Sequence, residues 1–222
     1  QRSLYQSMRG QLRQVFSTVQ SGLEQIPLDI RDNLTLVMGS EKEIIAAYSL
    51  LLKKKIQSMK IRVHGDLHLG KFIAVNNEFV LRDFEGKTDS PMSERRLKRS
   101  PVKDVAGMIN SFHWAAYYAL LRQLRVQSKD LHAVEPWADV WADSMSQIFL
   151  KAYCAAMNNF TPPLIPGATD ETILLLTLFS INRAIGEIGL RFRIGKENAI
   201  DIPVMALKKF ISLMSAIPGK AQ

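Results

Sequence analysis

The sequence predicts a mainly α-helical chain that carries one small β-hairpin. Apolar residues recur every three or four positions over most of the 222 residues, a spacing that is typical of amphipathic helices. The pattern changes after residue 60, where two apolar runs flank the pair Asn76-Asn77. Hydrophobic residues make up 47% of the chain, which excludes intrinsic disorder, and no linker interrupts it. We therefore expect residues 1–222 to form a single domain.

Three helices are expected before residue 60. The first has apolar residues spaced by three or four up to Pro27, namely Leu4, Met8, Leu12, Val15, Val19 and Leu23. The second covers Asp29 to Met38, because Gly39 stops it. The third follows the capping box Ser40-Glu41-Lys42-Glu43 and carries the apolar run Ile44 to Leu52.

Three short strands are expected next, at residues 61–63, 72–75 and 78–84. The second and third are separated by only two residues, Asn76 and Asn77. Because asparagine tolerates positive φ angles, this pair fits a two-residue hairpin turn.

The expected turn also sets which residues of the hairpin face each other. Counting back from it places Phe72 opposite Leu81 and Gly70 opposite Asp83. The hairpin therefore returns Asp83 to the loop at residues 64–70, the one place where the pattern forces polar residues together.

The rest of the chain again has a helical pattern. Ser100-Pro101 is a good N-cap and first-turn pair for a helix that runs from Val102 past Ala119. Asp104 lies in the first turn of that helix, where the helix dipole by itself favours an acidic side chain. Three more helices are expected at residues 135–158, 169–192 and 202–215.

Charge and cysteine content limit the class of protein. The net charge of +8 suits a nucleic acid, an acidic membrane surface or a phosphorylated small molecule, and cannot choose among them. No RNA-binding signature accompanies the charge and no apolar run is long enough to cross a bilayer, so we expect neither nucleic acid nor membrane as a partner. The single cysteine, Cys154, excludes a disulfide scaffold and suits a reducing cytoplasm. The chain opens with Gln1 and shows no secretory leader, so we expect a cytoplasmic fragment of something longer.

The densest group of chemically active residues is the run His64-Gly65-Asp66-Leu67-His68-Leu69-Gly70-Lys71. Residues 65–71 fit the phosphate-binding pattern G-x-x-x-x-G-K, but Phe72 stands where that motif needs Ser or Thr, and a strand follows instead of a helix. A zinc site is a second interpretation, because His64, Asp66 and His68 alternate and would share one face of an extended segment.

A kinase catalytic loop fits this run better. Phosphoryl transfer needs one carboxylate to orient the attacking hydroxyl and a second to hold magnesium on the phosphates. Asp66 in the loop, and Asp83 returned beside it by the hairpin, are arranged to supply both. Asp83-Phe84-Glu85-Gly86 also matches the D-F-G type of metal motif, with the glycine allowing a sharp turn.

Four segments together resemble the maltokinases. They are RSLYQSMRGQLRQVF, HGDLHLG, RDFEG and SERRLKRSPVKDVAGMINSFHWAA, and the resemblance is strong over residues 2–118. Within that family the chain most resembles the kinase part of proteins in which a maltokinase follows a trehalose synthase. The resemblance implies the C-terminal helical lobe of a protein-kinase-like fold of the aminoglycoside-phosphotransferase type. It also implies ATP and magnesium as cofactors and phosphorylation of maltose to maltose 1-phosphate, a reaction that feeds α-glucan (glycogen) synthesis in bacteria.

The same resemblance implies roles for individual residues. Asp66 matches the catalytic base of the family, and Asp83 matches its magnesium-binding aspartate. His64 and His68 match the histidines that frame the loop, and we expect them to bind the nucleotide cofactor. Independently of the resemblance, Glu85 is a candidate for a second metal ligand or for a sugar contact, and an exposed acid at the end of a strand is the simpler alternative.

Position 71 departs from the family pattern. Maltokinases have glutamine there as a magnesium ligand, whereas this chain has Lys71, whose ammonium group cannot coordinate a cation. Three interpretations of Lys71 remain open: it takes over part of the cation's role beside the cofactor, one metal site is lost, or the domain is no longer catalytic. The alternative function is a non-catalytic kinase-like module that binds α-glucan or a fused trehalose synthase domain.

A kinase of this class also needs an N-terminal β-lobe with a glycine-rich loop over the phosphates. The first 60 residues have a helical pattern and contain only Gly10, Gly22 and Gly39. We therefore expect this chain to be the C-terminal lobe alone, inactive in isolation and dependent on an upstream lobe.

Overall fold

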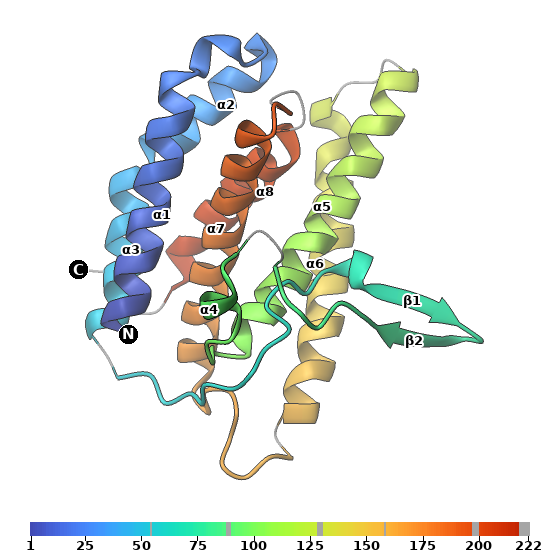
Figure 1. Ribbon diagram of the computed structural model, residues 1–222. Helices are drawn as coiled ribbons and strands as arrows, with labels where there is room; N and C mark the ends of the chain where they lie inside the picture. The colour runs from blue at the N-terminus through green and yellow to red at the C-terminus, as the bar shows by residue number, and fades with distance from the viewer. Residues whose placement is uncertain (54, 88–89, 128–130, 158, 197–199, 218–222) are drawn as a thin grey trace. The chain divides into compact units, whose positions relative to one another are not determined.

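The computed structural model describes residues 1–53, 55–87, 90–127, 131–157, 159–196 and 200–217. Within these ranges it contains eight α-helices and one two-stranded antiparallel sheet (Figure 1), so the prediction of a mainly α-helical chain with one hairpin is confirmed. Contacts between residues divide the chain into two compact units. One comprises residues 1–56 and 177–222, and the other comprises residues 57–176.

Helices are the regular secondary structure of the first unit in its described residues. Its helices are α1 (Arg2–Ser21), α2 (Leu28–Gly39), α3 (Glu41–Lys53), α8 (Asp201–Ser212) and the later part of α7 (Thr169–Arg193). α1 packs on α3, and α2 packs on α8. The stripe expected in the first helix does face the core, because Met8, Leu12, Val15 and Val19 are all buried.

Two glycines of α7 allow its backbone to approach α1. A Cβ atom added at Gly186 would lie 2.7 Å from the Gln11 side-chain nitrogen, and one added at Gly189 would lie 2.6 Å from a methyl carbon of Val15. Gln11 also donates a hydrogen bond of 3.3 Å to the Asn182 carbonyl. The two helices are therefore packed more closely than any residue with a side chain would allow at these positions.

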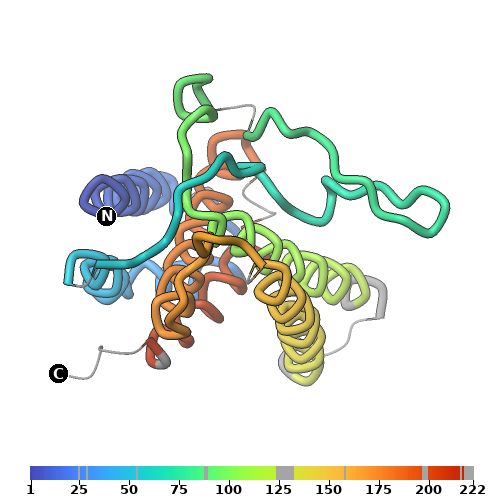
Figure 2. Tube along the Cα trace, turned by 90° about the horizontal axis from the view of Figure 1, so that it is seen from below, coloured from blue at the N-terminus to red at the C-terminus, as the bar shows by residue number. Residues whose placement is uncertain are grey.

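The second unit contains the hairpin and a pair of long helices. Its elements are β1 (Phe72–Val75), β2 (Glu78–Leu81), α4 (Met92–Arg95), α5 (Val102–Gln127), α6 (Leu131–Met157) and the beginning of α7. α5 packs along α6. Figure 2 shows the β1–β2 ribbon extending away from this helix pair.

The hairpin has the predicted turn and register. Asn76 and Asn77 both have positive φ angles, 48° and 65°, as a two-residue turn of this type requires. Phe72 pairs with Leu81, as the count from the turn predicted. The second strand ends at Leu81 rather than at residue 84, because Asp83 has a φ of 62° and leaves the extended conformation.

Three other details differ from the expectation. Residues 61–63 form no strand in the described structure, since Ile61 makes a single bridge to Arg99. The four-residue helix α4 was not predicted, because it is too short to show a period. α6 begins at Leu131 and has Pro136 inside it, whereas the sequence suggested a start beside that proline; its expected last residue, Asn158, lies outside the described residues.

The prediction that no apolar segment is long enough to cross a bilayer is wrong for helix α7. Among the described residues, α7 is long and apolar enough to do so by length and composition. Within its most apolar window, however, 61% is buried inside the protein, which is typical of a core helix.

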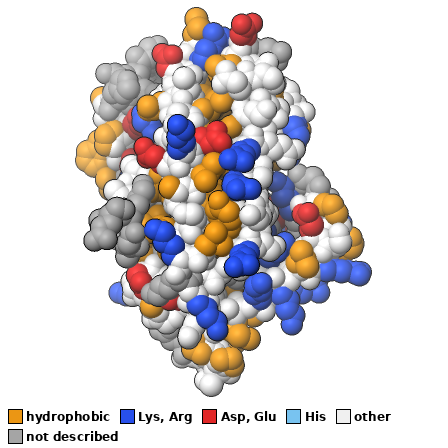
Figure 3. Space-filling view, turned by 90° about the vertical axis from the view of Figure 1, so that its left-hand side faces the viewer, with side chains coloured by type: hydrophobic (Ala, Val, Ile, Leu, Met, Phe, Trp, Pro, Cys, Tyr) orange, Lys and Arg blue, Asp and Glu red, His pale blue; other side chains and the backbone are white. Residues whose placement is uncertain are grey.

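The surface agrees with the positive net charge. On the face shown in Figure 3, Lys and Arg side chains predominate over Asp and Glu side chains. They are dispersed over this face rather than gathered in one stripe.

The close approach of α7 to α1 gives a test of the packing. We expect Gly189→Ala to lower the free energy of unfolding by about 1–2 kcal/mol, because the new methyl group must displace Val15. Gly10→Ala is the matched control: nothing lies within 4 Å of a Cβ atom there, so the same substitution should raise stability by about 0.5–1 kcal/mol. Urea denaturation of both variants measures the difference, and equal effects would contradict the packing argument.

Candidate active site

The loop at residues 64–71 and the end of the hairpin bring two carboxylates to one ammonium group. The Lys71 Nζ atom lies 3.0 Å from Asp83 Oδ2 and 3.8 Å from Asp66 Oδ2. The side chains of Lys71 and Asp66 are each 16% exposed, so water screens this pair less than it screens a surface pair. The arrangement is a partly enclosed site in which one cation serves two acids.

Lys71 changes the chemistry of Asp83 directly. Its hydrogen bond to the carboxylate is the main reason that the pKa of Asp83 is held below its ordinary value of 3.8. The positive charges of Lys71 and Arg82 add to this effect, and Arg82 Nε lies 3.6 Å from the same carboxylate oxygen. Asp83 is therefore ionised at neutral pH and available to a cation.

The local backbone explains why Asp83 points into the site. Beyond the last strand pair, the Arg82 N–H donates to the Lys71 carbonyl at 3.0 Å, so the ladder continues for one more residue. Asp83 then adopts a left-handed φ of 62°, a conformation that aspartate tolerates better than most residues. The ladder thus pairs Lys71 with Arg82, and the change of backbone direction at Asp83 lets its carboxylate meet the Lys71 ammonium group.

His64 ties the loop to the hairpin through both ring nitrogens. Its Nε2 lies 2.8 Å from the Arg82 carbonyl, which can only accept, so Nε2 carries the proton. Its Nδ1 then accepts the Asp66 N–H at 3.3 Å. The ring is buried and lies 5.4 Å from the ring of Phe84. In this conformation His64 positions Asp66, and the nucleotide contact that the resemblance implies for His64 stays a prediction.

His68 lies near the side-chain carboxylate of Asp66, whereas His64 bonds to the backbone of that residue. Its Nε2 is 3.8 Å from Asp66 Oδ2, while its Nδ1 accepts the Gly70 N–H at 3.1 Å. The second interaction caps the short turn at Leu69–Lys71 that delivers Lys71 to the site.

One face of helix α5 holds the loop through hydrogen bonds and close packing. The Asp104 carboxylate accepts the N–H groups of His64 at 2.7 Å and of Gly65 at 2.9 Å. One turn later, Gly107 leaves room for the Leu67 carbonyl, which would lie 2.4 Å from a Cβ atom at that position.

The same face of α5 makes a third contact one turn further along. The Ser111 hydroxyl accepts the N–H of Leu69 at 3.1 Å. Asp104, Gly107 and Ser111 are spaced by three and four residues, so they share one side of the helix.

Sequence reasoning missed this support. It placed Asp104 in the first helical turn for helix reasons alone, whereas the structure shows the side chain holding the catalytic-loop candidate. Burial raises the pKa of Asp104, and the hydrogen bonds from Gly65 and His64 oppose that rise. The spacing D-x-x-G-x-x-x-S was visible, but no sequence signal says what faces that side of the helix.

Glu85 lies apart from the acidic pair, and two alternative interpretations of the loop fail. The Glu85 side chain is exposed, and within the described structure no contact joins its carboxylate to Asp66, Lys71 or Asp83; its metal role stays a prediction. The zinc interpretation fails, because no group of three His, Cys, Asp or Glu residues in the described ranges could hold a metal ion. The phosphate-loop interpretation fails because β1, not a helix, follows Lys71.

Known proteins show what this fold resembles. No family model matches the chain. A curated glucosamine kinase from Streptacidiphilus jiangxiensis is 27% identical over 93 residues, which cover 42% of this chain and 20% of that protein. A solved glucosamine kinase in complex with glucosamine, ADP and inorganic phosphate has a TM-score of 0.73 at 18% identity, covering 96% of this chain and 48% of that one. A second structure, crystal form A of glucosamine kinase, has a TM-score of 0.74 at 18% identity and covers 96% and 47%.

These likenesses establish the fold. Nearly all of the chain superposes on part of a glucosamine kinase, and the chain spans about half the length of those solved structures. The hairpin and the helices described above are thus arranged as in part of an enzyme that handles a sugar and a nucleotide.

The Lys71–Asp83 contact predicts a titration. We expect the Asp83 carboxyl to titrate below 3.8 and to move back toward that value in Lys71→Met. Because the folded-state pKa is lowered, the pair stabilises the protein at pH values above the ordinary pKa, and this contribution is lost as the pH falls through the lowered pKa. Carbon-detected NMR titration of the carboxyl measures both values, and an unchanged midpoint in Lys71→Met would rule out the assigned cause.

The Asp104 contacts predict a loss of stability. Asp104→Asn keeps the size of the side chain but offers one acceptor oxygen instead of two, which leaves one buried N–H unpaired. We expect a loss of about 1–3 kcal/mol in the free energy of unfolding. Asp32→Asn, an exposed aspartate on α2, is the control and should change it by less than about 0.5 kcal/mol. Chemical denaturation decides, and equal stability of the two variants would show that the anchor contributes nothing.

Proposed function

We propose that this chain is the mainly helical catalytic part of a sugar kinase, which transfers the γ-phosphate of ATP to a sugar hydroxyl. One observation carries the proposal: Asp66 and Asp83, in the loop and hairpin order of a kinase, face a single cation. Phosphoryl transfer depends on positioning and charge neutralisation and needs two such carboxylates. The shared fold and the sequence similarity to glucosamine kinase support the assignment.

Asp66 is the catalytic base in this proposal. Its carboxylate orients the attacking sugar hydroxyl and accepts the hydroxyl proton as the oxygen attacks the γ-phosphorus. The loop holds the residue in place from two sides, because its backbone N–H bonds to His64 while its carboxylate lies near Lys71 and His68.

Asp83 fits a magnesium ion that arrives with ATP. Magnesium is usually held by one or two carboxylates together with substrate phosphates and water, and Asp83 supplies an ionised carboxylate that is 33% exposed. When bound, the ion neutralises charge on the phosphates. Lys71 supplies a fixed positive charge between the two acids, in place of the neutral ligand seen in maltokinases.

Two acceptor sugars have separate support. The resemblance of residues 2–118 to maltokinases supports maltose, with maltose 1-phosphate as the product. The 27% identity to glucosamine kinase supports an amino sugar. We propose maltose or a related α-glucoside as the acceptor and glucosamine as the competing candidate, in a cytoplasmic enzyme.

The hairpin supports the need for a further lobe. Its apolar side chains are exposed over much of their surface, with Ile73 at 43%, Val75 at 45%, Phe79 at 77% and Val80 at 49%. Such a patch on a thin ribbon marks a surface that other protein or ligand atoms cover. We infer that an upstream lobe covers it and completes the ATP site, and the resemblance to maltokinases adds a fused trehalose synthase domain to this proposal.

The catalytic role of Asp66 can be tested in the full-length gene product that contains this chain. We expect ATP consumption that depends on maltose, and a loss of about 10²- to 10⁴-fold in kcat for Asp66→Asn, because the base is removed while the side-chain shape is kept. Glucosamine, assayed in parallel, shows which acceptor is preferred. Asp32→Asn is the control, since it makes the same chemical change at an exposed aspartate on α2, in the first compact unit.

Lys71 separates the enzyme from the non-catalytic alternative. If the wild-type protein shows no ATP consumption with either sugar and Lys71→Gln restores it, the chain is a kinase-like module that has lost its activity. Binding of α-glucan without turnover would then be its function.

A further inference from the structure

We propose that a stacked pair of aromatic side chains on α5, Trp114 and Tyr118, binds the glucosyl unit of the acceptor that is not phosphorylated. The two ring centroids lie 4.9 Å apart and the ring planes differ by 11°, so the rings form one stack. Trp114 is 37% exposed and Tyr118 is 46% exposed, so this aromatic stack is open to a ligand. Its role rests on the proposed sugar kinase function, and it selects an α-glucoside of two rings over a single sugar.

The aromatic stack lies on the face of α5 that holds the loop at residues 64–71. Ser111, on that face, accepts the N–H of Leu69 at 3.1 Å. Trp114 and Tyr118 follow Ser111 by three and seven residues, so they lie on the same side of the helix. The stack therefore begins one turn beyond the last contact between α5 and the loop.

The spacing along α5 suits an acceptor of two linked rings. The carbonyl of Leu67, the residue after Asp66, rests against Gly107 of α5. Trp114 lies seven residues beyond Gly107, which is about 10.5 Å along a helix axis. Its side chain leans back toward the start of the helix, as helical side chains do. A disaccharide is of this length, so a sugar whose reacting hydroxyl meets Asp66 brings its second ring to the stack.

Tryptophan and tyrosine rings suit a sugar ring chemically. The C–H bonds on one face of a pyranose pack on an aromatic face, while the sugar hydroxyl groups stay free to form hydrogen bonds. Tyr118 carries a hydroxyl group at the edge of its ring, and Arg122, exposed one turn later on the same face, adds hydrogen-bond donors. The face thus combines an apolar surface with polar groups at its rim.

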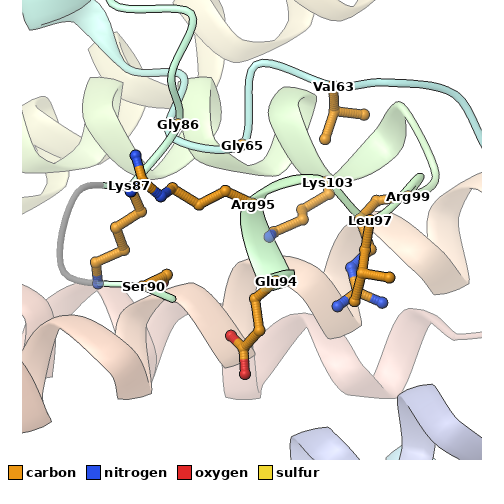
Figure 4. Close-up of a pocket in the computed structure, with 10 residues that line it drawn as sticks. All are labelled: Val63, Gly65, Gly86, Lys87, Ser90, Glu94, Arg95, Leu97, Arg99 and Lys103. Atoms are coloured by element: carbon orange, nitrogen blue, oxygen red, sulfur yellow. The ribbon is translucent and has the colours of Figure 1, made fainter. Parts of the chain in front are cut away.

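The hollow beside Gly65 offers no comparable surface to a sugar. It measures about 60 Å³, which is room for only a few heavy atoms. None of the described residues that line it is aromatic, as Figure 4 shows. A sugar ring has no stacking surface there, whereas α5 supplies one beside the same loop.

Sugar binding to the full-length gene product, measured without ATP, tests the aromatic stack. We expect calorimetric titration with maltose to show a binding event that weakens about five- to tenfold in Trp114→Ala, because a stacking contact is lost. Binding of glucosamine, which has one ring, should stay unchanged in that variant. Trp137→Ala is the matched control: Trp137 is a 74% exposed tryptophan on α6, and its loss should leave maltose binding unchanged.

Further variants guard against misfolding of Trp114→Ala. Tyr118→Ala should also weaken maltose binding, whereas Trp114→Phe keeps an aromatic ring and should retain most of the affinity. In the kinase assay, Trp114→Ala should raise the KM for maltose with little change in kcat, because the stack holds a ring remote from the reacting atoms.

Several results overturn the proposal. If the wild type does not bind maltose, or if both alanine variants bind it normally, the pair only stabilises α5. Equal weakening of glucosamine binding in Trp114→Ala would mean that the stack holds the reacting ring. Weaker binding of ATP, with maltose binding unchanged, would mean that a nucleobase stacks there instead.

Failure of the kinase assignment gives a different result. A protein that binds maltose through Trp114 but consumes no ATP with either sugar keeps the sugar-binding stack and loses the proposed function. A protein that phosphorylates maltose, while Trp114→Ala leaves maltose binding and KM unchanged, keeps the proposed function and loses the role of the stack.

Discussion

Two backbone N–H groups that donate to the Asp104 carboxylate hold the loop on which the candidate active site is built. They belong to His64 and Gly65, the residues immediately before Asp66. Because Asp104 lies on α5, whose neighbouring side chains Val105 and Ala106 are buried, the loop takes its position from a packed helix rather than from its own conformation. The missing side chain at Gly107 lets the loop backbone rest directly on that helix.

The charges of Asp66, Asp83 and Lys71 then decide which ions the site can bind. The carboxylates of Asp66 and Asp83 both lie within 4 Å of the Lys71 ammonium group, which offsets their like charges from within the chain. The same ammonium group occupies the position where the resembling enzymes have a neutral metal ligand. In the proposed kinase, a magnesium ion bound at Asp83 would share that carboxylate with Lys71. Lys71 is therefore the residue that most clearly separates the proposed kinase from the non-catalytic alternative.

The hairpin presents a surface of a different kind. Its apolar side chains Ile73, Val75, Phe79 and Val80 are exposed over much of their area, which suits cover by another part of the protein.

The sequence by itself determined the features that local chemistry decides. The period of apolar residues determined the helices, and the Asn76-Asn77 turn determined the hairpin and its register, so the approach of Asp83 to the loop followed from counting residues. Only the tertiary structure decided the support by Asp104 and the hydrogen bonds by which the buried His64 ring joins Asp66 to Arg82. These depend on which helix face meets which loop, and such contacts join residues far apart in the chain. A local sequence pattern does not predict these contacts, because they are selected by the packing free energy of the whole unit and not by that of one segment.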